Sequence, residues 1–126
     1  MLSLLNDDDN QILAQLAASQ FRASFHLSSK LRNYFNDKGA IKIHDHAVNF
    51  IAKRLAPARI NNDGKQTPMK NHPVFIAQHA TATCCRGCLN RWYGVAKNRE
   101  LTVAEQTKIV DIIMAWIERD NKDHRA

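Results

Sequence analysis

The sequence lacks an apolar run long enough to cross a membrane and lacks a complete set of disulfide partners. No stretch approaches the roughly 20 apolar residues that a membrane helix requires. The N-terminus MLSLLNDDDN becomes acidic too early for the apolar core of a secretory signal. The three cysteines stand within five consecutive positions, and an odd number of cysteines cannot pair completely. We therefore expect a cytoplasmic protein with reduced thiols and no membrane partner.

Acidic residues are nearly absent from the middle of the chain. Residues 53–99 hold nine Lys and Arg side chains and one acid, Asp63, whereas the remaining residues carry nine basic and eleven acidic side chains. The net charge of +6 therefore arises in the middle, and such a basic segment favours nucleic acid or a phosphorylated ligand as partner. The alternative is a solvated surface that only aids solubility. The candidate polyanion-binding residues are Lys65, Lys70, Arg86, Arg91, Lys97 and Arg99.

The length and the apolar spacing predict the fold class. A chain of 126 residues is long enough for one domain with its own core and short for two. Apolar residues recur at helical spacing in five segments. We therefore predict a mainly α, single compact domain over residues 1–126, with about five helices, a long central loop and, as an option, one short strand or hairpin. The predicted helices cover residues 7–26, 28–38, 45–56, 83–93 and 102–120.

Local signals set the predicted helix boundaries. Asp45 and Thr83 are candidate N-caps, and Gly94 supplies a left-handed stop. Thr102 and Glu105 have the spacing of a capping box. Residues 57–82 are expected to be loop or extended chain, with a short strand in PVFIAQHATA. A loop of this length beside the cysteines is a candidate functional surface.

One long string, RLAPARINNDGKQTPMKNHPVFIAQHATATCCRGCLNRW, together with LTVAEQTKIVDIIMAWI, resembles the bacterial family catalogued as Domain of Unknown Function 4186. The resemblance extends from about Phe21 to Ile117 and implies no activity, because the family has none established. The usual pattern of the family has glycine where this chain has Asn71 and histidine where it has Tyr93. Any role of that histidine in the family is therefore not expected in this chain. The matching residues are Asp63, Gly64, Lys65, Gln66, His72, Gln78, His79, Thr81, Cys84, Cys85, Arg86, Cys88 and Trp92.

The cluster of cysteine and histidine has three interpretations, of which the first is a zinc site. Cysteines at i, i+3 or i+4 of one helix can hold a single tetrahedral ion, and thiolate with imidazole suits zinc. One histidine lies just before the predicted helix, and a further ligand has to come from elsewhere in the chain. The candidate ligands are Cys84, Cys85, Cys88, His79 and His72, with His46 as an alternative.

The second interpretation is thiol chemistry. The first turn of a helix favours a thiolate, and Arg86 adds positive charge beside it. An enzyme of this kind would act on a phosphorylated or nucleic-acid substrate, with His79 as acid or base and Cys85 as nucleophile. A zinc deaminase is excluded, because Thr81 stands in place of the catalytic glutamate and no proline precedes the cysteines.

The third interpretation is an ordinary core. Cys85, Cys88, Leu89 and Trp92 share one helical face, and buried cysteines commonly act as small apolar residues. Taken together, the sequence favours a small intracellular polyanion-binding protein, for nucleic acid in the first place, whose cluster is a structural zinc site or part of the core. The enzyme is the alternative.

Overall fold

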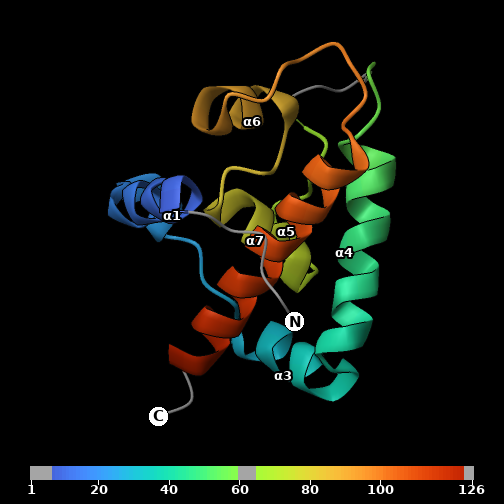
Figure 1. Ribbon diagram of the computed structural model, residues 1–126. Coiled ribbons are helices and arrows are strands. Elements are labelled where there is room, and N and C mark those ends of the chain that lie inside the picture. Colours follow the sequence, from blue (N-terminus) through green and yellow to red (C-terminus); the bar gives the residue numbers. More distant parts are fainter. Residues whose placement is uncertain (1–6, 60–64, 124–126) are drawn as a thin grey trace.

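The computed structural model describes residues 7–59 and 65–123, the first three of these as backbone only. Within this part of the chain there are seven helices and no strand (Figure 1). The mainly α class and the single compact domain are thus confirmed. None of the described helices is both long and apolar enough to cross a membrane. The helices are α1 Asp7–Ala18, α2 Gln20–Ala23, α3 Ser29–Lys38, α4 Ala40–Arg54, α5 Pro73–Ala80, α6 Arg86–Tyr93 and α7 Val103–Asp123.

The long C-terminal helix α7 is the centre of the packing. It lies against α4 and α5, while α3 closes one end of the molecule and α6 the other (Figure 1). Ile113 and Ile117 of α7 pack with Ile43 and Ile51 of α4, and all four side chains are completely buried. Each buried side chain of this size stabilises the fold by roughly 1.5–3 kcal/mol.

Helix α5 corrects the prediction of a strand in residues 73–82. The side chain of His72 accepts a hydrogen bond from the Val74 N–H at 3.0 Å, and Pro73 occupies the first turn. Both features are typical of a helix start. Every residue of α5 is buried, so its sequence shows no polar face, and a short apolar run without periodicity does not distinguish a buried helix from a strand.

Three other predicted boundaries are wrong. The first predicted helix is interrupted at Ser19, which caps α2. Helix α4 begins at Ala40 rather than at Asp45, because Gly39 at φ 89° reverses the chain directly after α3. The N-cap of α6 is Cys85 rather than Thr83, so Cys84 and Cys85 lie before the helix and not in its first turn.

Other local signals are confirmed. Gly94 ends α6 in the left-handed conformation at φ 70°. Thr102 and Glu105 form the reciprocal capping box at the start of α7: the Thr102 N–H donates to Glu105 Oε1 at 2.9 Å, and the Glu105 N–H donates to Thr102 Oγ1 at 3.1 Å.

Arg86 is part of the interior, which corrects its assignment to a polyanion-binding surface. Its side chain is 3% exposed. One guanidinium nitrogen donates to the carbonyls of Leu55 and Pro57, each at 3.2 Å, and the other donates to the carbonyl of Ala96 at 2.7 Å. Arg86 therefore joins the end of α4, the start of α6 and the segment that follows α6.

We expect Arg86→Met to lower the free energy of unfolding by about 3 kcal/mol, because buried carbonyls lose a charged donor. Arg91→Met removes the same charge from an exposed position of the same helix and should change stability by less than about 0.5 kcal/mol. Urea denaturation followed by circular dichroism measures both. Equal losses in the two variants would contradict the structural role of Arg86.

Candidate metal centre

Three cysteine side chains converge at the junction of α5 and α6. The Sγ atoms of Cys84, Cys85 and Cys88 all lie within 4.8 Å of one another, with the first two side chains buried and the third half-buried. Around one zinc ion, with Zn–S bonds of about 2.3 Å, sulfurs stand roughly 3.8 Å apart. The three thiols are therefore close to the arrangement that a single ion requires.

A tight turn after α5 brings Cys84 into the cluster. Ala82 adopts a left-handed φ of 59°, which costs an L-residue about 1–2 kcal/mol. The turn is fixed by two hydrogen bonds between Gln78 and Thr83, one from the Thr83 N–H at 2.9 Å and one from the Gln78 side chain at 3.0 Å. Thr67 Oγ1 then donates to the Cys84 carbonyl at 2.7 Å, which ties the preceding segment to the cluster.

The N-cap geometry of α6 aligns the other two sulfurs. Cys85 Sγ accepts a hydrogen bond from the Cys88 N–H at 3.4 Å. A cap of this kind holds the side chain of the capping residue over the first helical turn. The sulfurs of the three cysteines converge, as predicted. Their convergence results from the turn after α5 and from the N-cap of α6, and not from a shared face of one helix.

Arg22 of α2 provides a positive charge at the cluster. Its guanidinium donates to Cys84 Sγ at 3.8 Å, to Cys88 Sγ at 3.3 Å and to the carbonyl of His79 at 2.6 Å. Sequence reasoning missed this residue, because it lies more than 60 positions before the cysteines and belongs to no local motif.

Hydrogen bonds within the cluster make Cys88 the acidic thiol. The Cys84 thiol, the Cys85 thiol and Arg22 lower the pKa of Cys88 to about 5, against the effect of burial. The hydrogen bond to Cys88, followed by burial, raises the pKa of Cys84, while burial is the main cause that raises the pKa of Cys85. At neutral pH the metal-free cluster therefore favours the thiolate form of Cys88 over that of Cys85, whose burial disfavours the nucleophilic role predicted for it.

The predicted histidine ligands lie in two different places. His79 is at the C-terminal end of α5, and its Nε2 donates to the carbonyls of Thr67 at 3.1 Å and Pro68 at 3.0 Å, while its ring stacks on Phe25. His72 is at the opposite end of α5, where its Nε2 lies 3.0 Å from Nδ1 of His46. In the described part of the chain, only the three cysteines form a group with metal-ligand spacing.

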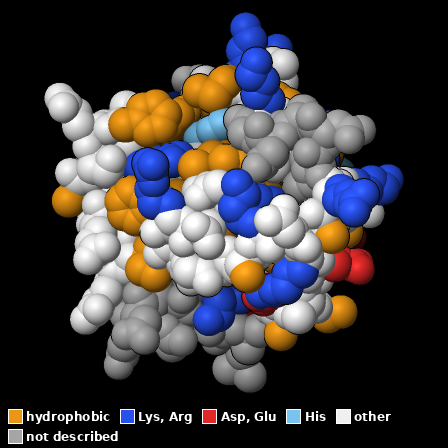
Figure 2. Space-filling view, turned by 90° about the horizontal axis from the view of Figure 1, so that it is seen from above, with side chains coloured by type: hydrophobic (Ala, Val, Ile, Leu, Met, Phe, Trp, Pro, Cys, Tyr) orange, Lys and Arg blue, Asp and Glu red, His pale blue; other side chains and the backbone are white. Residues whose placement is uncertain are grey.

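The predicted polyanion-binding residues differ in whether their charge is open to a partner. Lys65, Lys70, Arg91 and Lys97 are exposed. Arg99 instead makes two hydrogen bonds of 2.7 Å to Glu105, which lower the pKa of Glu105 to about 2. Figure 2 looks onto the end of the molecule that carries α6, and several Lys and Arg side chains spread over this face with few acidic ones between them.

The fold and the site together define a small, mainly α-helical protein with a largely buried three-cysteine cluster and an arginine as its counter-charge. The chain belongs to the family described as Domain of unknown function (DUF4186), whose model matches residues 10–118. The resemblance seen in the sequence is therefore confirmed. No solved structure matches this fold.

The His72–His46 pair generates a prediction about pH. Burial, and secondarily the neighbouring His46, lowers the pKa of His72 to about 4. Between about pH 6.5 and 4 the unfolded chain binds a proton at this site that the folded protein does not bind, so stability falls as the pH falls. The loss amounts to about 3 kcal/mol over this interval.

We expect His72→Asn to remove most of this pH dependence, because the asparagine side chain still caps the Val74 N–H but does not titrate. His44→Asn, in which a half-buried histidine of α4 is replaced, should keep the wild-type dependence. Urea unfolding at a series of pH values compares the three proteins. A slope in His72→Asn equal to that of the wild type would show that other groups cause the effect.

Proposed function

We propose that this protein binds one soft metal ion, zinc in the first place, through the thiolates of Cys84, Cys85 and Cys88. The convergence of the three Sγ atoms within 4.8 Å supports this proposal more than any other observation. Three thiolates around Zn²⁺ carry a net charge of −1, and Arg22 supplies the compensating +1. Thiolate ligands select such ions over magnesium or calcium.

The proposed role of the ion is structural. Cys84 and Cys85 lie between α5 and α6, and Cys88 is in the first turn of α6. Because Arg22 connects them to α2, a bound ion would hold three separate helices together. Binding would also displace the thiol protons of Cys84 and Cys85, which links metal affinity to pH. A fourth ligand is required for a tetrahedral site, and His79 is the candidate at this end of α5.

Titration of the chelator-treated protein with Zn²⁺ should show about one equivalent bound and a rise in the melting temperature. Cys88→Ser should lose most of the affinity, and Arg22→Met should weaken it about 10- to 100-fold, as for other groups that hydrogen-bond metal ligands. His72→Asn is the control and should bind zinc like the wild type, because His72 lies at the far end of α5.

Substitution of Co²⁺ for Zn²⁺ adds a direct measurement, since a thiolate-bound cobalt ion shows sulfur-to-metal charge-transfer absorption that follows the number of thiolates. His79→Gln tests the fourth ligand: a loss of affinity with an unchanged thiolate band would assign the position to His79. Less than about a tenth of an equivalent of bound metal in the wild type would leave the cysteines as core residues.

Polyanion binding is the second candidate function, and the basic face in Figure 2 favours it. Arg91 lies on α6 with Cys88, and Lys97 follows that helix. Lys65 and Lys70 lie in the segment that Thr67 ties to the Cys84 carbonyl, and all four side chains are exposed. Nucleic acid is the polyanion that we propose, because regularly spaced phosphates suit several separate cationic side chains. The metal would then position this face without contacting the nucleic acid.

We expect binding to short duplex DNA to weaken steeply as the salt concentration rises, with a logarithmic slope of about −0.9 for each phosphate contact. The double variant Lys65→Glu/Lys70→Glu should reduce the magnitude of this slope by about 2. The matched control is Lys30→Glu/Lys42→Glu, which makes the same charge change near α3, at the opposite end of the molecule. Equal effects of the two variants would indicate attraction by net charge alone.

A further inference from the structure

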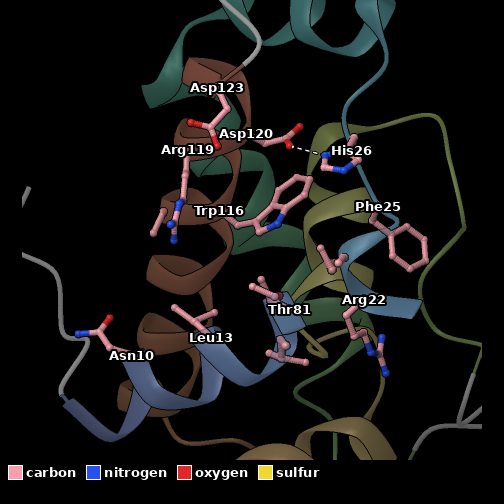
Figure 3. A pocket seen from close by; sticks show the side chains of 15 residues that line it. Asn10, Leu13, Arg22, Phe25, His26, Thr81, Trp116, Arg119, Asp120 and Asp123 are labelled. Carbon is pink, nitrogen blue, oxygen red and sulfur yellow. Dashed lines mark hydrogen bonds and ion pairs between the residues drawn. The ribbon is translucent and has the colours of Figure 1, made fainter. Parts of the chain in front are cut away.

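A cavity of about 410 Å³ lies apart from the cysteine cluster, between α1, α2, the end of α5 and α7 (Figure 3). Its walls are largely apolar and include Leu13 and Leu16 of α1 and Trp116 of α7. In the view of Figure 3, the indole of Trp116 lies beside the His26–Asp120 pair and above Leu13. A volume of this size is within the range of small-molecule sites.

The polar feature of the cavity is a histidine held by a carboxylate. His26 Nδ1 lies 2.8 Å from Asp120 Oδ1, and the second oxygen of Asp120 accepts a hydrogen bond from the Leu27 N–H at 2.8 Å. The Asp120 side chain is 7% exposed, whereas that of His26 is 55% exposed. The carboxylate favours the tautomer with the proton on Nδ1, so the lone pair of the neutral ring is on Nε2.

This arrangement joins two segments that are distant in sequence, because His26 follows α2 and Asp120 is near the end of α7. Four charged side chains line the cavity, and their formal charges sum to zero: Arg22, Arg119, Asp120 and Asp123. The cavity therefore combines an aromatic and aliphatic wall with one oriented hydrogen-bond acceptor and little net charge. Such a set favours a planar, weakly polar ligand over an ion.

We propose that this cavity binds a small aromatic ligand that carries an acidic O–H or N–H group. The ring packs against Trp116 and the apolar side chains of α1, and the O–H or N–H donates to Nε2 of His26. Asp120 acts as a positioning residue, because it fixes the orientation and the tautomer of the imidazole. Support for this ligand comes from neither the proposed metal site nor the proposed polyanion surface.

The probes for the experiment are p-cresol and p-xylene, which have nearly the same shape but differ in the hydroxyl group. Binding is followed by the NMR signal of the Trp116 indole N–H in the Trp92→Phe protein, where Trp116 is the remaining tryptophan. We expect both probes to shift this signal, and p-cresol to bind about fivefold more tightly because of its hydrogen bond to His26.

Two variants make the test specific. His26→Phe keeps a ring but no acceptor, and should abolish the preference for p-cresol while p-xylene still binds. His44→Phe, outside the cavity, should keep the preference. Ala115→Trp fills the cavity from an exposed position of α7, and should abolish the binding of both probes without loss of folding.

Two results would overturn the proposal. One is the absence of any Trp116 shift with either probe at millimolar concentration, and the other is an unchanged p-cresol preference in His26→Phe. The zinc titration provides the separate readout for the metal site. A protein that binds zinc but neither probe retains the metal function and loses this one, and the reverse result retains the cavity alone.

Discussion

The complete burial of α5 is the constraint on which the rest of the structure depends. A helix leaves polar backbone groups unsatisfied at both ends, and when the whole helix is inside the protein these groups cannot turn to water. His72 satisfies the first end as a cap, and the Gln78–Thr83 hydrogen bonds close the second. The second solution is a tight turn, and that turn leads Cys84 and Cys85 to the start of α6, beside Cys88. The cysteine cluster is thus a consequence of how a buried helix ends.

Two arginines show why a count of charges in the sequence gives an incomplete account of the surface. Arg86 lies in the basic middle segment but is buried against backbone carbonyls, and Arg99 is compensated by Glu105. Arg22 lies outside that segment and yet supplies the positive charge at the thiols. Position in sequence assigns charge to a region, whereas burial and tertiary contacts decide whether the charge is available to a partner.

Local features were predictable and long-range ones were not. The end of α6 at Gly94 and the capping box of Thr102 and Glu105 depend on a few neighbouring residues, so the sequence is sufficient to identify them. The spacing of the cysteines predicts that they lie near one another, whereas the turn and the N-cap that bring their sulfurs together were not predicted. Helix α5 was predicted wrongly because its apolar residues have no period, and the contact of Arg22 with the cysteines depends on how α2 packs. The His26–Asp120 pair spans 94 positions and has no motif.

Helix α2 connects the two proposed sites. It has four residues and none of them is buried, so its position depends on contacts of side chains rather than on a core face. Arg22 lines the cavity and also donates to two of the sulfurs. In the proposed metal-bound state the ion and the three thiolates together carry a net charge of −1, the same as Cys88 alone as thiolate, so the ion changes how firmly the sulfurs beside Arg22 are held rather than their net charge. A bound ion would then also fix the α2 wall of the cavity, so that metal loading and ligand affinity would be coupled through one guanidinium group.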